Sequence, residues 1–502
     1  MNTPREDAPT GRLSGVFFCV AQCSRGTGEA DGSKMPRELV SFLCIGLCCA
    51  IPAFAENLTK LELDRIYQSA AADYDAGRYP RAAEELERVL PYAARSYEVH
   101  ELLGMVYASL AENPKAEDQL KIAVQLNPKS AAARTNFGTI LLHSGKTALA
   151  GEQFREALQL DPQSFDANHN LAEFLLQSGK IAEARPLLET AHSIQPDSYD
   201  NGYDLAMADF HLGQIENARE IAESIASKQN TGELQNLLGQ IDEKDGKFVA
   251  AANEFEAAAH MDPSEDNLFD WGSEMLLHRT YEPAIAIFQQ ATVRYPRSPR
   301  LFIGLGLALY SRGKYDDAVQ ALLTAADLNP SDPRCYLFLS KAYDSSPKQA
   351  EGVIERFRRY AELRPQDALA QYYFAMSLWK GKRAEDSNAD LQTVESLLRK
   401  SIALDGNLPE SHVQLGDLYA GQHQYDKSIP EYVRALELNP NLSDAHYRLG
   451  TDYVHVGHKD EAQKEFAVYQ KLRAEHLAEI DKERAEVQQF VYSEKNSAPS
   501  KF

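Results

Sequence analysis

An alanine recurs along this chain of 502 residues at almost constant intervals. The steps are 33 or 34 residues long, and the recurring positions are Ala116, Ala150, Ala184, Ala218, Ala251, Ala284 and Ala318. A fixed period of this length indicates a stack of similar structural units, each of which buries its apolar face against its neighbours. Such a stack has no single compact core and acts by presenting an extended surface to another molecule.

The segment Ser130–Pro162 shows the pattern of one unit. Two helices are expected in it, because Gly145 interrupts the helical spacing and Pro162 pushes the residue before it out of the helical region. Small and apolar residues at helical spacing mark one face of each helix: Phe137, Gly138 and Leu141 in the first, then Ala150, Phe154 and Ala157 in the second. We expect the small residues to lie where the two helices cross most closely, with Phe154 filling the space beside them.

This arrangement of small residues, an aromatic residue and a closing proline resembles the tetratricopeptide repeat. The same pattern recurs between about residues 60 and 470, where about twelve units can be counted, and the first, fifth, ninth and tenth units depart from it. The tenth unit carries an insertion around Gly381–Asp390, between its two helices. The resemblance implies an all-α fold, an α-solenoid in which helix-turn-helix units form a right-handed superhelix.

In proteins that this chain resembles, the second, fifth, ninth and twelfth positions of each first helix face a concave groove. The candidate partner-binding residues at these positions are Arg300, Ile303, Leu307, Tyr310, Arg334, Lys341, Tyr372, Met376 and Trp379, and Leu337 occupies the same kind of position. Basic, aromatic and methionine side chains on an otherwise acidic chain suit an extended peptide or a helix laid in the groove. The alternative is that some of them, especially Leu337 and Trp379, pack between helices.

The composition and the short motifs argue against several kinds of site. The chain has 52 Lys and Arg against 74 Asp and Glu, a formal charge of −22, so its surface repels phosphate backbones and no nucleic-acid partner is expected. Ser144–Thr147 imitates the end of a phosphate-binding loop, but Ile140 stands where that loop needs a glycine. His455 and His458 have no third metal ligand at a regular spacing. We therefore expect no catalytic residue, no cofactor and no metal.

Residues 35–55 have the features of a signal peptide. Arg37 gives the positive start, and a 13-residue apolar run follows from Leu39 to Ile51. The next residues match the small-x-small pattern read by a signal peptidase, which predicts cleavage after Ala55. Because the run is shorter than the about 20 residues of a membrane-spanning helix, no stable span is expected after cleavage. The predicted location is periplasmic or secreted.

Residues 1–34 show no repeat and are expected to be a disordered upstream extension, with Met35 the better initiator. Five of the six cysteines lie before Ala55, and only Cys335 lies after it. The mature chain could therefore form no internal disulfide and no cysteine-based metal site.

Residues 471–492 are expected to form one charged helix with a narrow apolar edge, and residues 493–502 a disordered tail. A repeat array needs a solvated end, so this helix would cap the solenoid of residues 60–470. A dimerisation helix is the alternative, and the oligomeric state is left open.

Three functions are compatible with these features. The first is a non-enzymatic scaffold that is exported across a bacterial inner membrane and binds partner proteins or peptides in the cell envelope. The second is a structural accessory subunit of an envelope polysaccharide-export or secretion assembly. The third, a cryptic enzyme, is disfavoured because no segment outside the repeats is long enough to fold alone.

Overall fold

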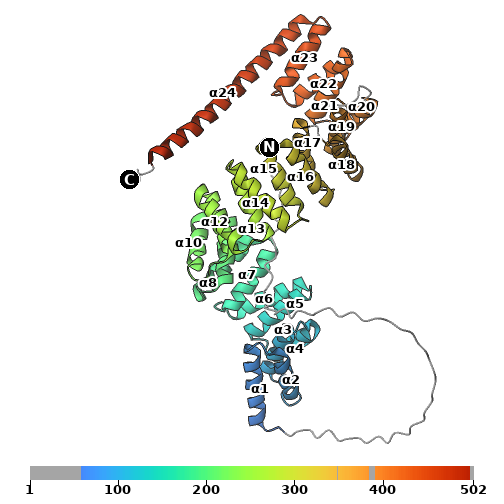
Figure 1. The fold of residues 1–502 in the computed structure, drawn as a ribbon. Helices are drawn as coiled ribbons and strands as arrows, with labels where there is room; N and C mark the ends of the chain where they lie inside the picture. The colour runs from blue at the N-terminus through green and yellow to red at the C-terminus, as the bar shows by residue number, and fades with distance from the viewer. Residues whose placement is uncertain (1–57, 347–348, 384–390, 498–502) are drawn as a thin grey trace, which may run out of the picture. The chain divides into compact units, whose positions relative to one another are not determined.

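The computed structural model describes residues 58–346, 349–383 and 391–497. Within these ranges the chain forms 24 α-helices and no β-strand (Figure 1). The expected signal peptide and upstream extension lie outside the described residues. None of the described helices combines the length and the apolar character that crossing a membrane requires.

The contacts between Cα atoms divide the chain into two compact units, which meet at the bond between Asn230 and Thr231. The helices of the first unit are α1 (Lys60–Asp75), α2 (Tyr79–Val89), α3 (Tyr97–Ser109), α4 (Asn113–Leu126), α5 (Ala131–His143), α6 (Thr147–Leu160), α7 (Phe165–Gln177), α8 (Ile181–Ile194), α9 (Tyr199–His211) and α10 (Ile215–Ala226).

The second unit contains the remaining helices. They are α11 (Gly232–Lys244), α12 (Phe248–Met261), α13 (Glu265–Leu277), α14 (Tyr281–Arg294), α15 (Pro299–Ser311), α16 (Tyr315–Leu328), α17 (Pro333–Ser345), α18 (Ala350–Leu363), α19 (Ala368–Arg383), α20 (Leu391–Leu404), α21 (Pro409–Gly421), α22 (Tyr425–Leu438), α23 (Ser443–His455) and α24 (Lys459–Ser497).

Inside each unit the helices pack in sequence order, and each odd-numbered helix except α17 packs most closely on the even-numbered helix that follows it. We call the odd-numbered helix of a pair its first helix. Several first helices also contact the first helix of the next pair, as α13, α15, α17 and α19 do in succession. The described residues thus form twelve helix pairs, and the prediction of an all-α solenoid built from repeated helix pairs is confirmed.

The close crossing inside a pair depends on the small residues that the sequence pattern identified. In the third pair, a Cβ atom added to Gly138 of α5 would lie 2.6 Å from the ring of Phe154 in α6. Ala150, Ala157 and Phe154 are all buried. A larger residue at Gly138 would push the two helices apart, so this part of the prediction is confirmed.

The helix boundaries follow from local chemistry. Most first helices begin directly after a Ser, Thr or Asp whose side chain accepts a hydrogen bond from a backbone N–H of the first turn, for example Ser130 before α5 and Ser298 before α15. Most second helices follow a tight turn with positive φ, which in α5–α6 is made by Gly145 at +73°. Ala111 occupies the equivalent turn position before α4, with φ at +59°. This conformation is strained for alanine because of its Cβ atom.

The ninth pair departs from the regular packing. α17 packs mainly on α16 and α18 mainly on α19, while α17 and α18 contact each other far less than the helices of any other pair do. Bulky rings separate them, because Tyr336 of α17 stacks on Tyr360 of α18 with ring centroids 4.0 Å apart. The tenth pair packs like the others, and the first three residues of the insertion expected at Gly381–Asp390 belong to α19, which ends at Arg383. Residues 384–390 lie outside the described residues.

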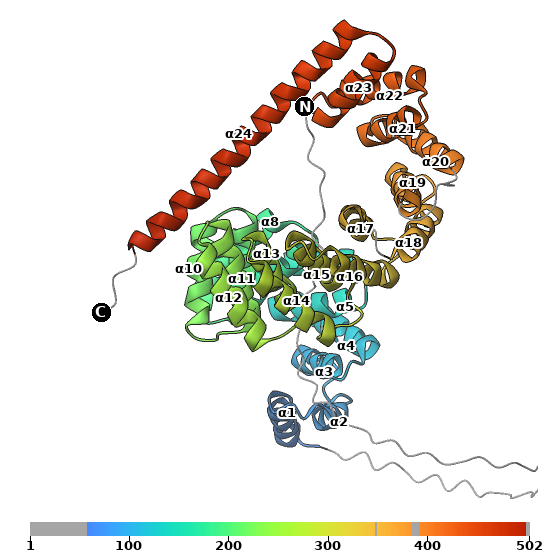
Figure 2. The same cartoon turned by 45° about the horizontal axis from the view of Figure 1, so that its top comes forward.

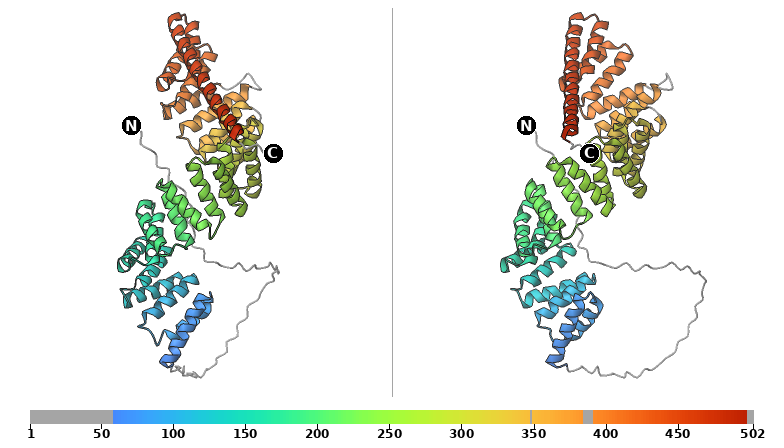
Figure 3. Two further views of the ribbon diagram at one scale, coloured as in Figure 1. Left: turned by 90° about the vertical axis from the view of Figure 1, so that its left-hand side faces the viewer. Right: turned by 60° about the vertical axis from the view of Figure 1, so that its left-hand side comes forward.

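The C-terminal helix differs from the prediction in its bounds. α24 is continuous from Lys459 to Ser497, so residues 471–492 continue the second helix of the twelfth pair and do not form a helix of their own (Figure 2 and Figure 3). The helix also includes residues 493–497, which were expected to be disordered, while 498–502 lie outside the described residues. No Gly or Pro occurs between Lys459 and Ser497 to end the helix. Whether it caps the stack or pairs with another chain stays a prediction.

Candidate partner-binding surface

The candidate residues lie on α15, α17 and α19. These are successive first helices of the second unit, and each contacts the next. On α15, Ile303 is only 9 % exposed and belongs to the apolar core of this unit. The prediction that Ile303 faces a partner is therefore wrong, because its side chain is used to pack the repeats together. Leu307 and Tyr310 are half-buried against the same core and keep part of their surface free.

Arg300 at the start of α15 already has anionic partners inside the protein. Its guanidinium forms ion pairs with Asp266 and with Glu265, the latter at 3.2 Å, and lies 4.7 Å above the ring of Phe269. All three partners belong to α13, the preceding first helix. The arginine that was expected to bind a carboxylate of a partner thus binds two carboxylates of its neighbouring repeat.

α17 offers the most exposed candidates. Leu337 is 37 % exposed, and Arg334 and Lys341 are exposed on the same helix face, three residues before it and four residues after it. Arg334 donates to Asp332 at the start of the helix at 2.7 Å, and these hydrogen bonds hold the pKa of the Asp332 carboxyl below its usual value. Lys341 lies 5.9 Å from the ring of Phe338.

On α19 the candidates are more buried. Trp379 is 6 % exposed and packs in an apolar cluster with Val394 and Leu398 of α20, so the prediction that it faces a partner is wrong and the alternative of packing between helices is confirmed. Tyr372 and Met376 are half-buried at the edge of this cluster. Burial, and then the nearby charge of a glutamate in α21, raise the pKa of the Tyr372 hydroxyl.

The structure thus reduces the candidate surface to one strip, which we call the α15–α19 strip. It consists of Leu307, Tyr310, Arg334, Leu337, Lys341, Tyr372 and Met376. Its centre on α17 carries an exposed leucine between two basic residues. The flanking residues on α15 and α19 add apolar and aromatic surface of lower exposure.

Polar side chains connect successive first helices, and sequence reasoning missed these connections. In the second unit, Asn236 of α11 donates to Asp270 of α13 at 2.9 Å, and in the first unit Asn136 of α5 donates to Glu101 of α3 at 3.1 Å. The two partners are 34 and 35 residues apart, about one repeat, so complementary polar residues at the repeat spacing were the available signal. These bonds fix the register between neighbouring repeats.

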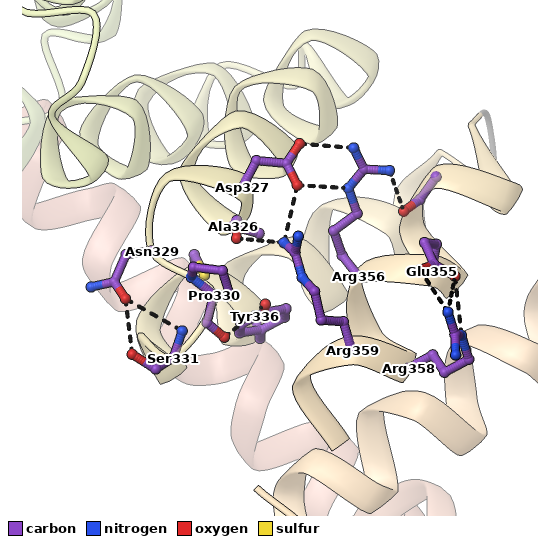
Figure 4. A network of polar contacts seen from close by, with 12 residues as sticks. Ala326, Asp327, Asn329, Pro330, Ser331, Tyr336, Glu355, Arg356, Arg358 and Arg359 are labelled. Carbon is purple, nitrogen blue, oxygen red and sulfur yellow. Dashed lines mark hydrogen bonds and ion pairs between the residues drawn. The ribbon is translucent and has the colours of Figure 1, made fainter. Parts of the chain in front are cut away.

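A second network lies on the second helices (Figure 4). Asp327 near the end of α16 accepts from Arg356 and Arg359 of α18, with Nη2 to carboxylate distances of 2.8 and 3.0 Å. Arg359 also donates to the backbone carbonyl of Ala326 at 2.8 Å. The hydrogen bonds from Arg356 are the main reason that the pKa of Asp327 is lowered. This network attaches α18 to α16, which matters because α18 has so few contacts with α17.

Family models for the tetratricopeptide repeat match the chain in many places. One matches residues 141–190 and 175–241, another residues 67–131, 109–165 and 278–333, and a TPR repeat model matches residues 416–454. Together these segments cover more than half of the chain. The chain belongs to the tetratricopeptide repeat family. This fold suggests a protein–protein interaction scaffold.

Individual relatives are distant. The human protein O-mannosyl-transferase TMTC3 is 23% identical over 206 residues, which is 39% of this chain and 21% of the relative. The TPR repeat-containing protein YpiA of Bacillus subtilis (strain 168) is 24% identical over 188 residues, 37% of this chain and 42% of the relative. The chain thus spans only about a fifth of the first relative and less than half of the second.

The similar solved structures include YrrB, described as a TPR protein with an unusual peptide-binding site. It is 15% identical with a TM-score of 0.34, and the alignment covers 37% of this chain and 96% of YrrB. The APC/C hetero-tetramer Cut9–Hcn1 is 16% identical with a TM-score of 0.37, over 82% of this chain and 94% of that chain. These TM-scores are too low to transfer any detail of those proteins to this tetratricopeptide repeat protein.

Proposed function

We propose that this tetratricopeptide repeat protein is a non-enzymatic scaffold of the cell envelope that binds an acidic, amphipathic segment of a partner protein on the α15–α19 strip. The observation that carries the proposal is the face of α17, where exposed Leu337 lies between Arg334 and Lys341 on a chain of formal charge −22. A basic and apolar surface favours segments that combine acidic and apolar residues.

The chemistry of the strip suits a peptide more than a small molecule. Leucine, methionine and tyrosine side chains provide apolar area, and Lys341 can hold a carboxylate of the bound segment. The exposed Arg334 is already paired with Asp332 and adds a second basic group beside it. The first helices on which they lie, α15, α17 and α19, pack against one another in succession, and Arg300 attaches α15 to α13. The binding surface is therefore formed before the partner arrives, which lowers the ordering cost of binding.

Charge and shape variants on α17 test this proposal. A displayed library of random peptides is selected against the purified protein, and the bound peptides are expected to combine acidic and apolar residues. Leu337→Asp and Lys341→Glu are each expected to weaken the selected peptides by about tenfold or more, because each removes a central contact.

Matched controls lie on second helices. Val293 of α14 is 83 % exposed and Lys400 of α20 is exposed, so Val293→Asp and Lys400→Glu make the same chemical changes away from the strip. They are expected to leave peptide binding unchanged. The proposal would be contradicted if the control variants lost as much peptide affinity as the α17 variants, or if the α17 variants lost none. A library without any peptide that depends on α17 would favour the alternative, a structural accessory subunit of an envelope polysaccharide-export or secretion assembly.

The envelope location rests on the export signal expected in residues 35–55. The chemistry of Cys335 fits such a location. It is the only cysteine after Ala55 and is buried in α17, where burial raises the pKa of its thiol to about 12. A thiol of this kind is protonated and shielded, so it does not form stray disulfides in an oxidising compartment.

Cleavage of the signal has a direct measurement. Mass spectrometry of the protein from its native host is expected to show a mature N-terminus at Glu56. Cytoplasmic protein that still begins at Met1 or Met35 would show that the chain is not exported.

A further inference from the structure

Two carboxylates and one imidazole meet between the sixth and seventh helix pairs. Glu243 lies near the end of α11, Glu274 lies in α13, and His278 follows the last residue of α13. The Nε2 atom of His278 is 3.1 Å from Oε2 of Glu243 and 3.3 Å from Oε1 of Glu274. One ligand atom of each side chain lies within 4.8 Å of the other two.

One carboxylate oxygen of Glu274 has no hydrogen-bond donor among these neighbours. Its side chain is only 4 % exposed, and its Oε1 atom is buried without a hydrogen-bond partner. The Nε2 atom of His278 carries at most one proton, and it forms its hydrogen bond with Glu243. Burying a carboxylate oxygen costs free energy when no hydrogen-bond donor replaces the water that it gives up. The cluster therefore has room for one more positively charged group beside Glu274.

The distances suit a metal ion. In a tetrahedral site with bonds of about 2.0–2.1 Å, neighbouring ligand atoms are about 3.3–3.4 Å apart, and the separations from His278 to Glu243 and Glu274 are close to this value. One imidazole with two carboxylates is a ligand set that Zn²⁺ accepts, with water in the fourth position. The harder ions Mg²⁺ and Ca²⁺ prefer oxygen ligands alone.

The ring of His278 is held in place for this role. It packs against the ring of Phe248, with centroids 4.4 Å apart, and Phe248 is the first residue of α12. The three ligands therefore come from α11 and the end of α13, while α12 supports the imidazole from the side. A ligand set supported by a packed ring needs little rearrangement when an ion binds.

We propose that Glu243, Glu274 and His278 form a binding site for a divalent transition-metal ion, preferably Zn²⁺, which clamps the first helices of the sixth and seventh repeats together. The site is independent of the α15–α19 strip.

Zinc titration of the full chain tests the proposal. The protein is treated with a chelator, dialysed, and titrated with Zn²⁺ by calorimetry at slightly alkaline pH. One equivalent is expected to bind to this site with a dissociation constant in the micromolar range or below, and to raise the melting temperature. Co²⁺ is used as a spectroscopic probe, because an ion with few ligands in tetrahedral geometry gives intense visible absorption bands.

Variants decide whether the ion binds at this cluster. Glu274→Gln keeps the shape of the buried side chain, and His278→Ala removes the imidazole. Both are expected to lose the Co²⁺ bands and to weaken Zn²⁺ binding by at least about tenfold. His455→Ala, an exposed histidine in the twelfth pair, serves as the matched control and is expected to bind as before.

Two results would overturn the site. The first is the absence of binding by the chelator-treated protein. The second is unchanged binding in both Glu274→Gln and His278→Ala, which would place the ion elsewhere. If Glu274→Gln does not fold, as circular dichroism would show, Glu243→Gln replaces it, because Glu243 is half-exposed and its carboxylate is equally needed.

Discussion

Replacing Phe288 with alanine is expected to lower the free energy of unfolding of the second unit by about 3–5 kcal/mol. Phe288 lies in α14 with its ring fully buried between two glycines of neighbouring first helices. A Cβ atom added to Gly272 of α13 would lie 2.8 Å from the ring, and one added to Gly304 of α15 would lie 2.6 Å from it. One ring thus fills the space between two successive repeats. The cavity left by alanine would be walled by the backbones of α13 and α15, which cannot easily move inward.

Urea unfolding followed by tryptophan fluorescence measures this loss. Both tryptophans of the chain, Trp271 and Trp379, lie in the second unit, so their signal reports on that unit. Val293→Ala in the same helix is the control, because its side chain points into solvent, and it is expected to change the stability by no more than about 0.5 kcal/mol. A loss for Phe288→Ala as small as that of the control would show that the ring does not join the repeats.

The pattern of small and large residues could be read from the sequence because it depends on local contacts inside one helix pair. Gly138 and Phe154 were expected to meet where α5 and α6 cross, and the structure places them in contact. The glycine turns and closing prolines likewise predicted where most helices end, since both act on the backbone of their own segment. The end of α24 could not be placed in this way, because no such signal occurs between Lys459 and Ser497.

The exposure of the candidate residues depends on contacts between repeats, which one sequence does not show. Ile303 and Leu337 occupy the same position in successive first helices, yet the first is buried and the second is exposed. Arg300 was expected to be free, but carboxylates of α13 reach it from the preceding repeat. The cluster of Glu274 and His278 with a glutamate of α11 also joins two repeats, so its three ligands have no recognisable motif.

The ninth pair is the clearest case in which the family pattern gives the wrong expectation. Tyr360 occupies the position at which most of the other repeats carry a small alanine, such as Ala325 in the eighth. A designer who follows the pattern would replace Tyr360 with alanine and expect a gain in stability. In the structure, however, Tyr360 is buried, stacks on Tyr336 of α17, and donates its hydroxyl to Asp367 at 3.1 Å.

Tyr360→Ala is therefore expected to lower the free energy of unfolding of the second unit by about 3–5 kcal/mol. The substitution removes the ring that joins α17 to α18, and these two helices make few other contacts that could compensate for its loss. Tyr360→Phe keeps the stack and loses only the hydrogen bond to Asp367, so its expected cost is about 1 kcal/mol. Fluorescence-detected urea unfolding of the two variants and the unchanged protein gives both values. If Tyr360→Ala were as stable as the unchanged protein, α17 and α18 would be able to close into an ordinary pair. The aromatic stack would then not be what holds this repeat open.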